Sequence, residues 1–240
     1  TNEILQTHGH RKNYDFAHAC VEMFNVTVEV HGEENLPDKE KNIFVCNHPL
    51  GGFDGVLLLN TLGKKYSNIK FLVNDILMNM KNMDGVFVPI NKHGAQAIEN
   101  VRRIDQVYSS DKQVITFPAG LVSRRKKGVI EDTVWHKNFI TKSIQYQRDV
   151  IPMHITGRCR NYFYNLSNLR KFLGIKANIE MFFLPKETYQ HKNNLYHLSI
   201  GKPIPCQVFD KRYKPLEWAE KVKRHCYSLP GDINRMFTAE

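Results

Sequence analysis

The sequence predicts a single α/β domain whose central sheet is mixed, mostly parallel and flanked by helices. Two observations lead to this fold class. Short apolar runs typical of buried strands alternate with segments whose apolar residues recur at helical spacing. The 240 residues lie near the upper end of one domain and show neither an internal repeat nor a low-complexity tract. Within residues 1–240 we expect a helical segment over 1–25, an α/β core over 26–205 and a C-terminal helical segment over 206–240.

The first half of the chain alternates helix and strand. Apolar residues at helical spacing predict a helix over 16–24, and alternation of valine with polar residues predicts a half-buried strand over 26–30. An unbroken apolar run predicts a fully buried strand over 43–46. The same criteria then predict a helix ending near Gly63, a strand over 69–73, a short helix capped by Asp75 and a strand over 86–90.

The second half continues this alternation, and motifs follow two of the predicted strands. Apolar spacing predicts helices over 98–108 and 135–144, strands over 114–117, 150–155 and 179–184, and a C-terminal helix over 218–226. In α/β folds, ligand sites gather beyond the carboxyl ends of strands. The segments that follow the strands ending at residues 46 and 117 are therefore the candidate sites.

Basic residues outnumber acidic ones, with 34 Lys and Arg against 24 Asp and Glu, for a formal net charge of +10. Such an excess favours an anionic partner, which could be phospholipid, nucleic acid or an acidic protein. The sequence has no zinc-finger spacing, no RNP-like aromatic motif and no basic region followed by heptads. We therefore expect an anionic membrane surface or an acidic carrier as the partner, and no nucleic acid. The sequence leaves the oligomeric state open.

Cysteine usage and hydropathy bear on location. The five cysteines are scattered without a Cys-x-x-Cys pair, which indicates reduced cytoplasmic thiols. No run approaches the roughly 18 apolar residues of a spanning helix, and no signal peptide opens the chain. His8 and His10 lack a carboxylate or cysteine neighbour, so we expect no metal site. The expectation is a cytoplasmic protein that lies peripherally on the inner face of the cytoplasmic membrane.

The first motif joins the predicted strand over 43–46 to the helix that follows it. Residues 47–55 bring together His48, Asp54 and three glycines. An imidazole titrates near neutrality, so His48 can remove a proton from an attacking hydroxyl or amine, while a nearby carboxylate fixes its tautomer. The glycines allow a sharp backbone turn. The alternative interpretation is a loop histidine followed by an ordinary helix N-cap at Asp54.

A resemblance to a known family lies in this segment, which reads Asn47-His48-Pro49-Leu50-Gly51-Gly52-Phe53-Asp54-Gly55. It resembles the signature of the lysophospholipid acyltransferase superfamily of PlsC-like glycerolipid acyltransferases, Asn-His followed by four residues and Asp. Five residues stand between His48 and Asp54 here, and we expect the pair Gly51-Gly52 to absorb the extra one. The segment is similar to the bacterial hemolysin-like branch, whose members form aminolipids such as ornithine and glycine lipids.

Two further segments resemble blocks of the same family. Residues 85–92 loosely match Gly-x-x-Phe-Ile-x-Arg and end in Asn91 and Lys92. Lys92 is suited to an anionic headgroup or carrier phosphate, although a buried strand ending in a solvated lysine has the same pattern. Residues 117–125 stand where the family has Phe-Pro-Glu-Gly-Thr-Arg-Ser. Ala119 replaces the Glu and Val122 the Arg implicated in holding an acceptor phosphate, and the aminolipid branch itself commonly shows Phe-Pro-Ala-Gly.

A basic pair, Arg124 and Arg125, closes this last segment. Guanidinium groups bind phosphate or carboxylate in bidentate fashion, so the pair could replace the lost contact. The alternative is a solvated basic loop. Ser123 lacks a Gly-x-Ser-x-Gly elbow, so we assign it to substrate contact and not to nucleophilic catalysis.

The resemblance implies a glycerolipid-acyltransferase-like fold and transfer of a fatty acyl group from acyl carrier protein or acyl-CoA to a lyso-lipid or amino-acid-type acceptor. It assigns catalysis to His48 as general base with Asp54, and it implies no cofactor beyond the thioester co-substrate. The substrate-binding residues that we expect are Asn47, Gly51, Gly52, Asn91, Lys92, Phe117, Pro118, Ala119, Gly120, Ser123, Arg124 and Arg125.

Two alternatives to this function stay open. One is a 1-acyl-glycerol-3-phosphate acyltransferase, whose acceptor is lysophosphatidic acid. The other is a non-catalytic membrane-binding module that keeps the same fold, which is motivated by Ala119, Val122 and the lengthened first block.

Overall fold

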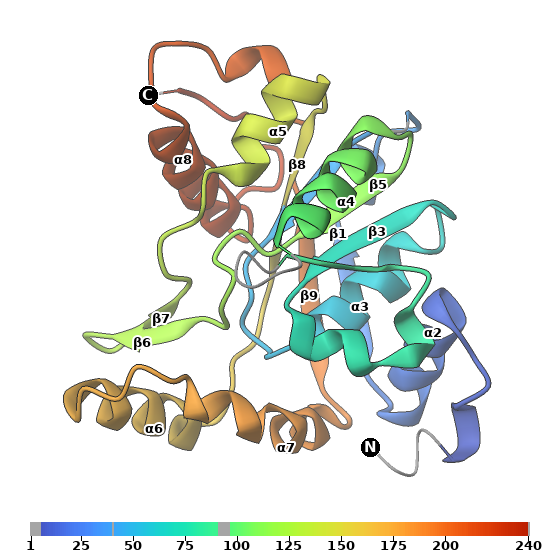
Figure 1. Cartoon of the computed structure of the whole chain (residues 1–240), viewed down its shortest axis with the longest axis vertical. Coiled ribbons are helices and arrows are strands. Elements are labelled where there is room, and N and C mark those ends of the chain that lie inside the picture. The colour runs from blue at the N-terminus through green and yellow to red at the C-terminus, as the bar shows by residue number, and fades with distance from the viewer. Residues whose placement is uncertain (1–5, 40, 91–96, 240) are drawn as a thin grey trace.

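A seven-stranded sheet forms the centre of the molecule, with strand order β1-β9-β8-β2-β5-β3-β4 (Figure 1). The computed structural model describes residues 6–39, 41–90 and 97–239. The strands are β1 (Thr27–His31), β2 (Ile43–Cys46), β3 (Ile69–Val73), β4 (Phe87–Pro89), β5 (Gln113–Thr116), β8 (Val150–Ile155) and β9 (Leu195–Ile200). The five strands from β8 to β4 are mutually parallel, whereas β1 and β9 run in the opposite direction. The predicted mixed, mostly parallel sheet is confirmed.

Helices cover both faces of this sheet (Figure 1). They are α2 (Asn13–Met23), α3 (Phe53–Leu62), α4 (Ala97–Ser109), α5 (Asn138–Tyr146) and α8 (Pro215–Ser228). One apolar cluster joins the sheet to α2 and α3, and a second joins it to α4, α5 and α8. Short helices lie between these elements, namely η1 (Glu33–Asn35), η2 (Asp75–Asn79), η3 (Lys81–Met83), η5 (Tyr189–His191) and η6 (Cys206–Val208).

Strand β2 explains why the central strands are unbroken apolar runs in the sequence. Successive side chains of a strand point to opposite faces of the sheet, and here both faces are covered. Phe44 and Cys46 lie in the cluster with α2 and α3, whereas Ile43 and Val45 lie in the cluster with α4, α5 and α8. All four side chains are fully buried. Strand β2 therefore holds the segment that follows it in a fixed place.

The strand predicted over residues 179–184 is wrong. This segment forms η4 (Ile179–Phe183) and the beginning of α7 (Leu184–Thr188). In a strand, the side chains of residues 180 and 182 would point to the same face of the sheet. Here Glu180 is fully buried in ion pairs, whereas Phe182 is 75% exposed. Pro185 also occupies the first turn of α7, a position that suits a helix start. The strand that the sheet uses instead is β9, which pairs with β1 and β8.

Three further elements, none of them predicted from the sequence, lie at one end of the molecule (Figure 1). The hairpin β6 (Arg124–Lys126)–β7 (Val129–Glu131) extends from the body beside α6 (Asn161–Phe172), and α7 follows along the same end. A small apolar cluster, separate from the two that cover the sheet, lies beneath them. Among the described residues, no helix combines the length and the apolar character needed to cross a bilayer.

Candidate active site

His48 and Asp54 meet at the carboxyl end of β2. His48 stands two residues after β2, and Asp54 lies in the first turn of α3. Nδ1 of His48 is 2.7 Å from Oδ2 of Asp54. The Asp54 side chain is fully buried and also accepts the backbone N–H groups of Leu50, Gly52 and Gly55, each at 3.0 Å. The longer spacing therefore still brings the histidine and the carboxylate into direct contact.

Two left-handed glycines make this contact possible. Gly51 has φ +67° and Gly52 has φ +110°, a region that residues with a side chain rarely adopt. A Cβ atom on Gly51 would lie 2.5 Å from Cδ2 of Leu184, whereas a Cβ on Gly52 would meet nothing within 4 Å. The chain thus needs glycine at 51 for both backbone and packing, and at 52 for the backbone alone.

The pKa shifts of the pair follow from burial and mutual attraction. Burial lowers the pKa of His48, but the charge of Asp54 and the hydrogen bond to it outweigh burial, so the pKa of His48 lies above its usual value. Burial raises the pKa of Asp54, yet His48 and the backbone N–H donors hold this pKa below its usual value. Asp54 is therefore ionised at neutral pH and stabilises a protonated imidazole.

The second ring nitrogen of His48 is available for chemistry. A carboxylate only accepts hydrogen bonds, so Nδ1 carries the proton and Nε2 of the neutral ring carries the lone pair. Nε2 makes no hydrogen bond to any residue that the structure describes. The side chain is 14% exposed and its ring stacks on Phe117, with centroids 4.1 Å apart and planes inclined by 12°. The arrangement suits a general base whose ring is held in place.

Asp132 is a second buried carboxylate at the site, and the sequence analysis missed it. Oδ1 accepts the backbone N–H of His48 at 3.1 Å and the hydroxyl of Ser123 at 2.6 Å, and Oδ2 accepts the indole N–H of Trp135 at 2.9 Å. Burial raises the pKa of Asp132, although these donors oppose the shift. The carboxylate joins the segment after β2 to the segment after β5. No local spacing marks it, because His48 stands 84 residues away.

Asn47 uses its side chain to extend the sheet. Its Oδ1 accepts the N–H of Ile155 at 2.8 Å, and its Nδ2 donates to the carbonyl of the same residue at 2.9 Å. The side chain thus continues the pairing of β2 with β8 beyond Cys46. Asn47 lies next to His48, but its amide is committed to the backbone. Its expected contact with substrate stays a prediction.

The segment after β5 begins against the histidine. Phe117 is half-buried and stacks on the His48 ring, and the carbonyl of Pro118 accepts the backbone N–H of His136 at 2.9 Å. Ala119 is buried in the apolar cluster that contains Trp135. Gly120 is exposed and has φ +65°. Of these residues, Phe117 is the one in contact with His48, and Gly120 is the one open to solvent.

The end of the same segment turns its polar groups inward. Ser123 is buried, with its hydroxyl on Asp132, and its N–H donates to the carbonyl of His48 at 2.8 Å. Arg124 is 5% exposed and pairs with the buried Glu180 at 2.9 Å. Arg125 is half-buried and donates to the side chain of Asn165. Their expected contacts with substrate stay predictions, and Asn91 and Lys92 lie outside the described residues.

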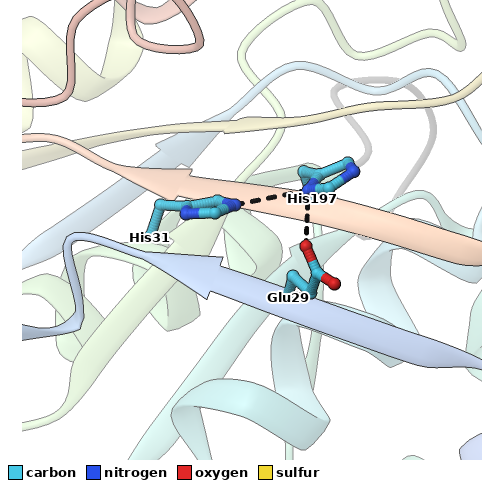
Figure 2. Close-up of side chains that lie close together, drawn as sticks. All are labelled: Glu29, His31 and His197. Carbon is cyan, nitrogen blue, oxygen red and sulfur yellow. Dashed lines mark hydrogen bonds and ion pairs between the residues drawn. The ribbon is translucent and has the colours of Figure 1, made fainter.

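Glu29, His31 and His197 form, within the described part of the chain, a group that could hold a metal ion. Figure 2 shows the three side chains converging from β1 and β9. Nδ1 of His197 lies 3.2 Å from Oε2 of Glu29 and 3.3 Å from Nε2 of His31. Glu29 and His31 are exposed, and each of the three already has a partner within the group. This group lies on β1 and β9, whereas His48 follows β2.

The chain matches a family of known proteins over nearly its whole length. Residues 1–234 match the family model described as Acyltransferase. The chain is 46% identical over 229 residues to a lyso-glycine lipid O-acyltransferase of Phocaeicola vulgatus, covering 95% of this chain and 82% of that protein. It is 48% identical over 229 residues to a lyso-glycine lipid O-acyltransferase of Bacteroides thetaiotaomicron, covering 95% of this chain and 84% of the relative.

A solved structure supports the fold. The crystal structure of the 1-acyl-sn-glycerophosphate (LPA) acyltransferase PlsC from Thermotoga maritima superposes with a TM-score of 0.57 at 18% identity. The match covers 92% of this chain and 80% of the PlsC chain, which shows a common fold. The family match and the two lyso-glycine lipid O-acyltransferases, together with this common fold, confirm the expected place in the aminolipid branch of the PlsC-like superfamily. The chain belongs to the acyltransferase family and is an acyltransferase.

Proposed function

We propose that this protein transfers a fatty acyl group from an acyl-carrier-protein or acyl-CoA thioester to the hydroxyl of a lyso-aminolipid, with lyso-glycine lipid as the leading acceptor. The observation that carries the proposal is the His48–Asp54 pair, with Nδ1 bonded to the carboxylate and Nε2 unpaired among the described residues. The acceptor class is supported by two relatives of that name at 46% and 48% identity.

In the proposed mechanism, Nε2 of His48 accepts the proton of the acceptor hydroxyl while the hydroxyl oxygen attacks the thioester carbonyl. The tetrahedral intermediate collapses with cleavage of the carbon–sulfur bond, and the departing thiolate takes the proton from His48 to leave as a free thiol. Asp54 stabilises the imidazolium and keeps the ring in register. No acyl-enzyme forms, and no cofactor enters the reaction.

The residue at position 122 favours an acceptor without a phosphate. The family's phosphate-holding Arg is replaced by Val122, which is fully buried in an apolar cluster with Cys159, Phe163 and Tyr164. Its neighbour Arg124 is already paired with Glu180. Lysophosphatidic acid, the second candidate acceptor, would therefore need another phosphate contact. A lyso-aminolipid has no such need.

The excess of basic residues supports an anionic donor and an anionic membrane as partners. The net charge of +10 attracts the acidic carrier protein or the phosphates of coenzyme A, and salt screens such attraction. We expect the apparent donor affinity to fall as salt rises, and a response independent of salt would contradict an electrostatically guided donor. We propose the inner face of the cytoplasmic membrane as the place of action.

The test is a direct assay of transfer. The purified protein is mixed with acyl carrier protein or coenzyme A thioesters and with lyso-glycine lipid, lyso-ornithine lipid, lysophosphatidic acid or free glycine, and products are identified by mass spectrometry. We expect a diacylated aminolipid and free thiol. His48→Ala should lower the rate by at least about 10²- to 10⁴-fold, the usual worth of general-base catalysis.

Two results would contradict the proposal. Full activity of His48→Ala would exclude the general-base mechanism. Binding to vesicles with no consumption of any thioester would favour the non-catalytic membrane-binding module.

A further inference from the structure

The outer surface of residues 158–190, which we call the platform, carries an unusual share of exposed apolar side chains. It comprises α6, η4 and α7, which lie along one end of the molecule (Figure 1). Phe172 is 86% exposed and Phe182 is 75% exposed, and Phe183 is also exposed. They are the exposed phenylalanines of the described chain. Leu169, Leu173, Ile175 and Tyr189 add further exposed apolar area.

The platform exposes these side chains although it also has a buried apolar core. The platform has its own interior, in which Phe163 and Tyr164 of α6 are fully buried with Val122 and Cys159. A buried Glu180 forms ion pairs of 2.9 Å with both Arg124 and Arg170 and so ties the hairpin to α6. The exposed apolar side chains are thus additional to a packed interior. So many exposed apolar side chains on one segment point to an interaction site.

The charged side chains of the platform also differ between its surface and its interior. Its exposed charged side chains, within the described residues, are all basic: Arg158, Arg160, Lys171, Lys176 and Lys186. Its two carboxylates, Glu180 and Glu187, are buried and paired with arginines. Apolar aromatic residues framed by Lys and Arg are the composition that binds the interface of an anionic bilayer.

We propose that the platform is the membrane-docking surface of this enzyme and that its partner is an anionic lipid bilayer. Phe172 and Phe182 insert among the acyl chains, while Lys171 and Lys176 contact anionic headgroups. The docking itself is independent of the acyl-transfer chemistry, whereas its purpose, delivery of a lyso-lipid, rests on the proposed function.

The platform is also in contact with the segment that carries His48. Leu184 of α7 packs on Gly51 so closely that a Cβ there would be 2.5 Å from it. The thiol of Cys159 donates to the carbonyl of Pro49 at 3.4 Å. Arg124 follows Ser123, whose N–H is bonded to the carbonyl of His48. Docking through the platform would therefore hold the His48 segment at the lipid surface, where a lyso-lipid acceptor resides.

The test measures vesicle binding without any substrate. Wild type is floated with vesicles of phosphatidylglycerol and phosphatidylcholine and with vesicles of phosphatidylcholine alone. We expect binding to the anionic vesicles, and a loss of at least tenfold in partition coefficient for Phe172→Ser/Phe182→Ser. The matched control, Leu216→Ser/Met236→Ser, removes two apolar side chains that are 48% and 61% exposed elsewhere and should bind as wild type does.

A second variant tests the exposed lysines of the platform. Lys171→Gln/Lys176→Gln should lose the preference for phosphatidylglycerol and the salt dependence of binding, with an unchanged melting temperature. Equal vesicle binding by wild type and by the phenylalanine variant would overturn the proposal. So would a wild-type dimer that the phenylalanine variant converts to a monomer, because the occupant of the platform would then be a second copy of the chain.

Activity assays separate this inference from the proposed function. Phe172→Ser/Phe182→Ser should transfer acyl groups at wild-type rate to a short-chain lyso-lipid dissolved below its micelle concentration, and tenfold or more slowly to the same headgroup embedded in vesicles. An equal loss with both acceptors would contradict the docking role. Failure of the acceptor assay in wild type would leave the vesicle result standing.

Discussion

The segment after β2 and the segment after β5 both resemble motifs of the family, yet their polar side chains are used differently. After β2, His48 and Asp54 face each other and leave Nε2 of the histidine unpaired among the described residues. After β5, Ser123 bonds to Asp132 and Arg124 pairs with Glu180, so both polar groups face the interior. The resemblance to a family motif identifies a functional segment. The hydrogen-bond partners then show whether a residue in that segment is available to substrate or instead holds its neighbours in place.

The largest effect that this comparison predicts is at Asp54. Asp54→Asn removes the charge that stabilises the imidazolium and disturbs the tautomer of His48, so kcat should fall by about 10²- to 10⁴-fold. In wild type, activity should be lost on acidification at a pH above the ordinary histidine value of about 6.5, because the pKa of His48 is raised. In the variant, burial of His48 remains but the attraction of Asp54 is lost, so the pKa of His48 should be lower and the residual activity should be lost at lower pH.

A pH profile of kcat for both proteins measures this shift. An acid limb at the same pH in wild type and Asp54→Asn would contradict the pairing.

The next largest effect should come from Asp132, which positions the histidine segment. Asp132→Leu leaves the N–H of His48, the Ser123 hydroxyl and the Trp135 indole without their acceptor, and each unsatisfied buried group costs about 1–3 kcal/mol. We expect a lower melting temperature and a kcat reduced by about tenfold, with KM for donor and acceptor little changed. Asp132→Asn keeps one acceptor oxygen but sets an NH2 group against the donor on the other side, so it should recover only part of the loss. A raised KM with normal kcat would instead indicate contact with substrate.

Arg124 should affect stability more than activity. Arg124→Met leaves Glu180 buried with Arg170 as its remaining partner, and breaking such a buried pair costs roughly 3–5 kcal/mol. Because Arg170 stays, we expect a loss near 3 kcal/mol in urea unfolding, with KM for the acceptor within about twofold of wild type. A stable variant whose KM rises tenfold would show that Arg124 leaves Glu180 to meet the substrate.

The smallest effect should be at Arg125, which is half-buried beside Asn165 and over the ring of Tyr164. Arg125→Ala should lower the free energy of unfolding by less than about 1 kcal/mol, as for other partly exposed polar contacts. Of the two arginines, Arg125 is the one without a carboxylate partner among the described residues and the one that is not fully buried. If it contacts an anionic group of a substrate, KM should rise a few-fold with kcat unchanged. Equal KM values for Arg125→Ala and wild type would remove Arg125 from the binding site.

The strand and the turn that carry His48 were the easiest to predict. The residues of β2 are all apolar because both faces of the sheet are covered. Gly51 and Gly52 were expected to absorb the extra residue, and both have positive φ. The strand predicted over 179–184 failed because apolar content alone does not distinguish a sheet from an exposed helical surface. There the buried Glu180 and the proline in the first turn of α7 decide the conformation.

By itself the sequence determined the fold class, the basic charge and the proximity of His48 to Asp54, because these depend on periodicity, composition and a contact between residues six positions apart. Only the tertiary structure decided that Asp132 holds the backbone of His48 and that Arg124 pairs with Glu180, contacts that span 84 and 56 positions. The tertiary structure also decided which apolar side chains of the platform are exposed to solvent. Such contacts form only when distant segments pack, so no local pattern records them.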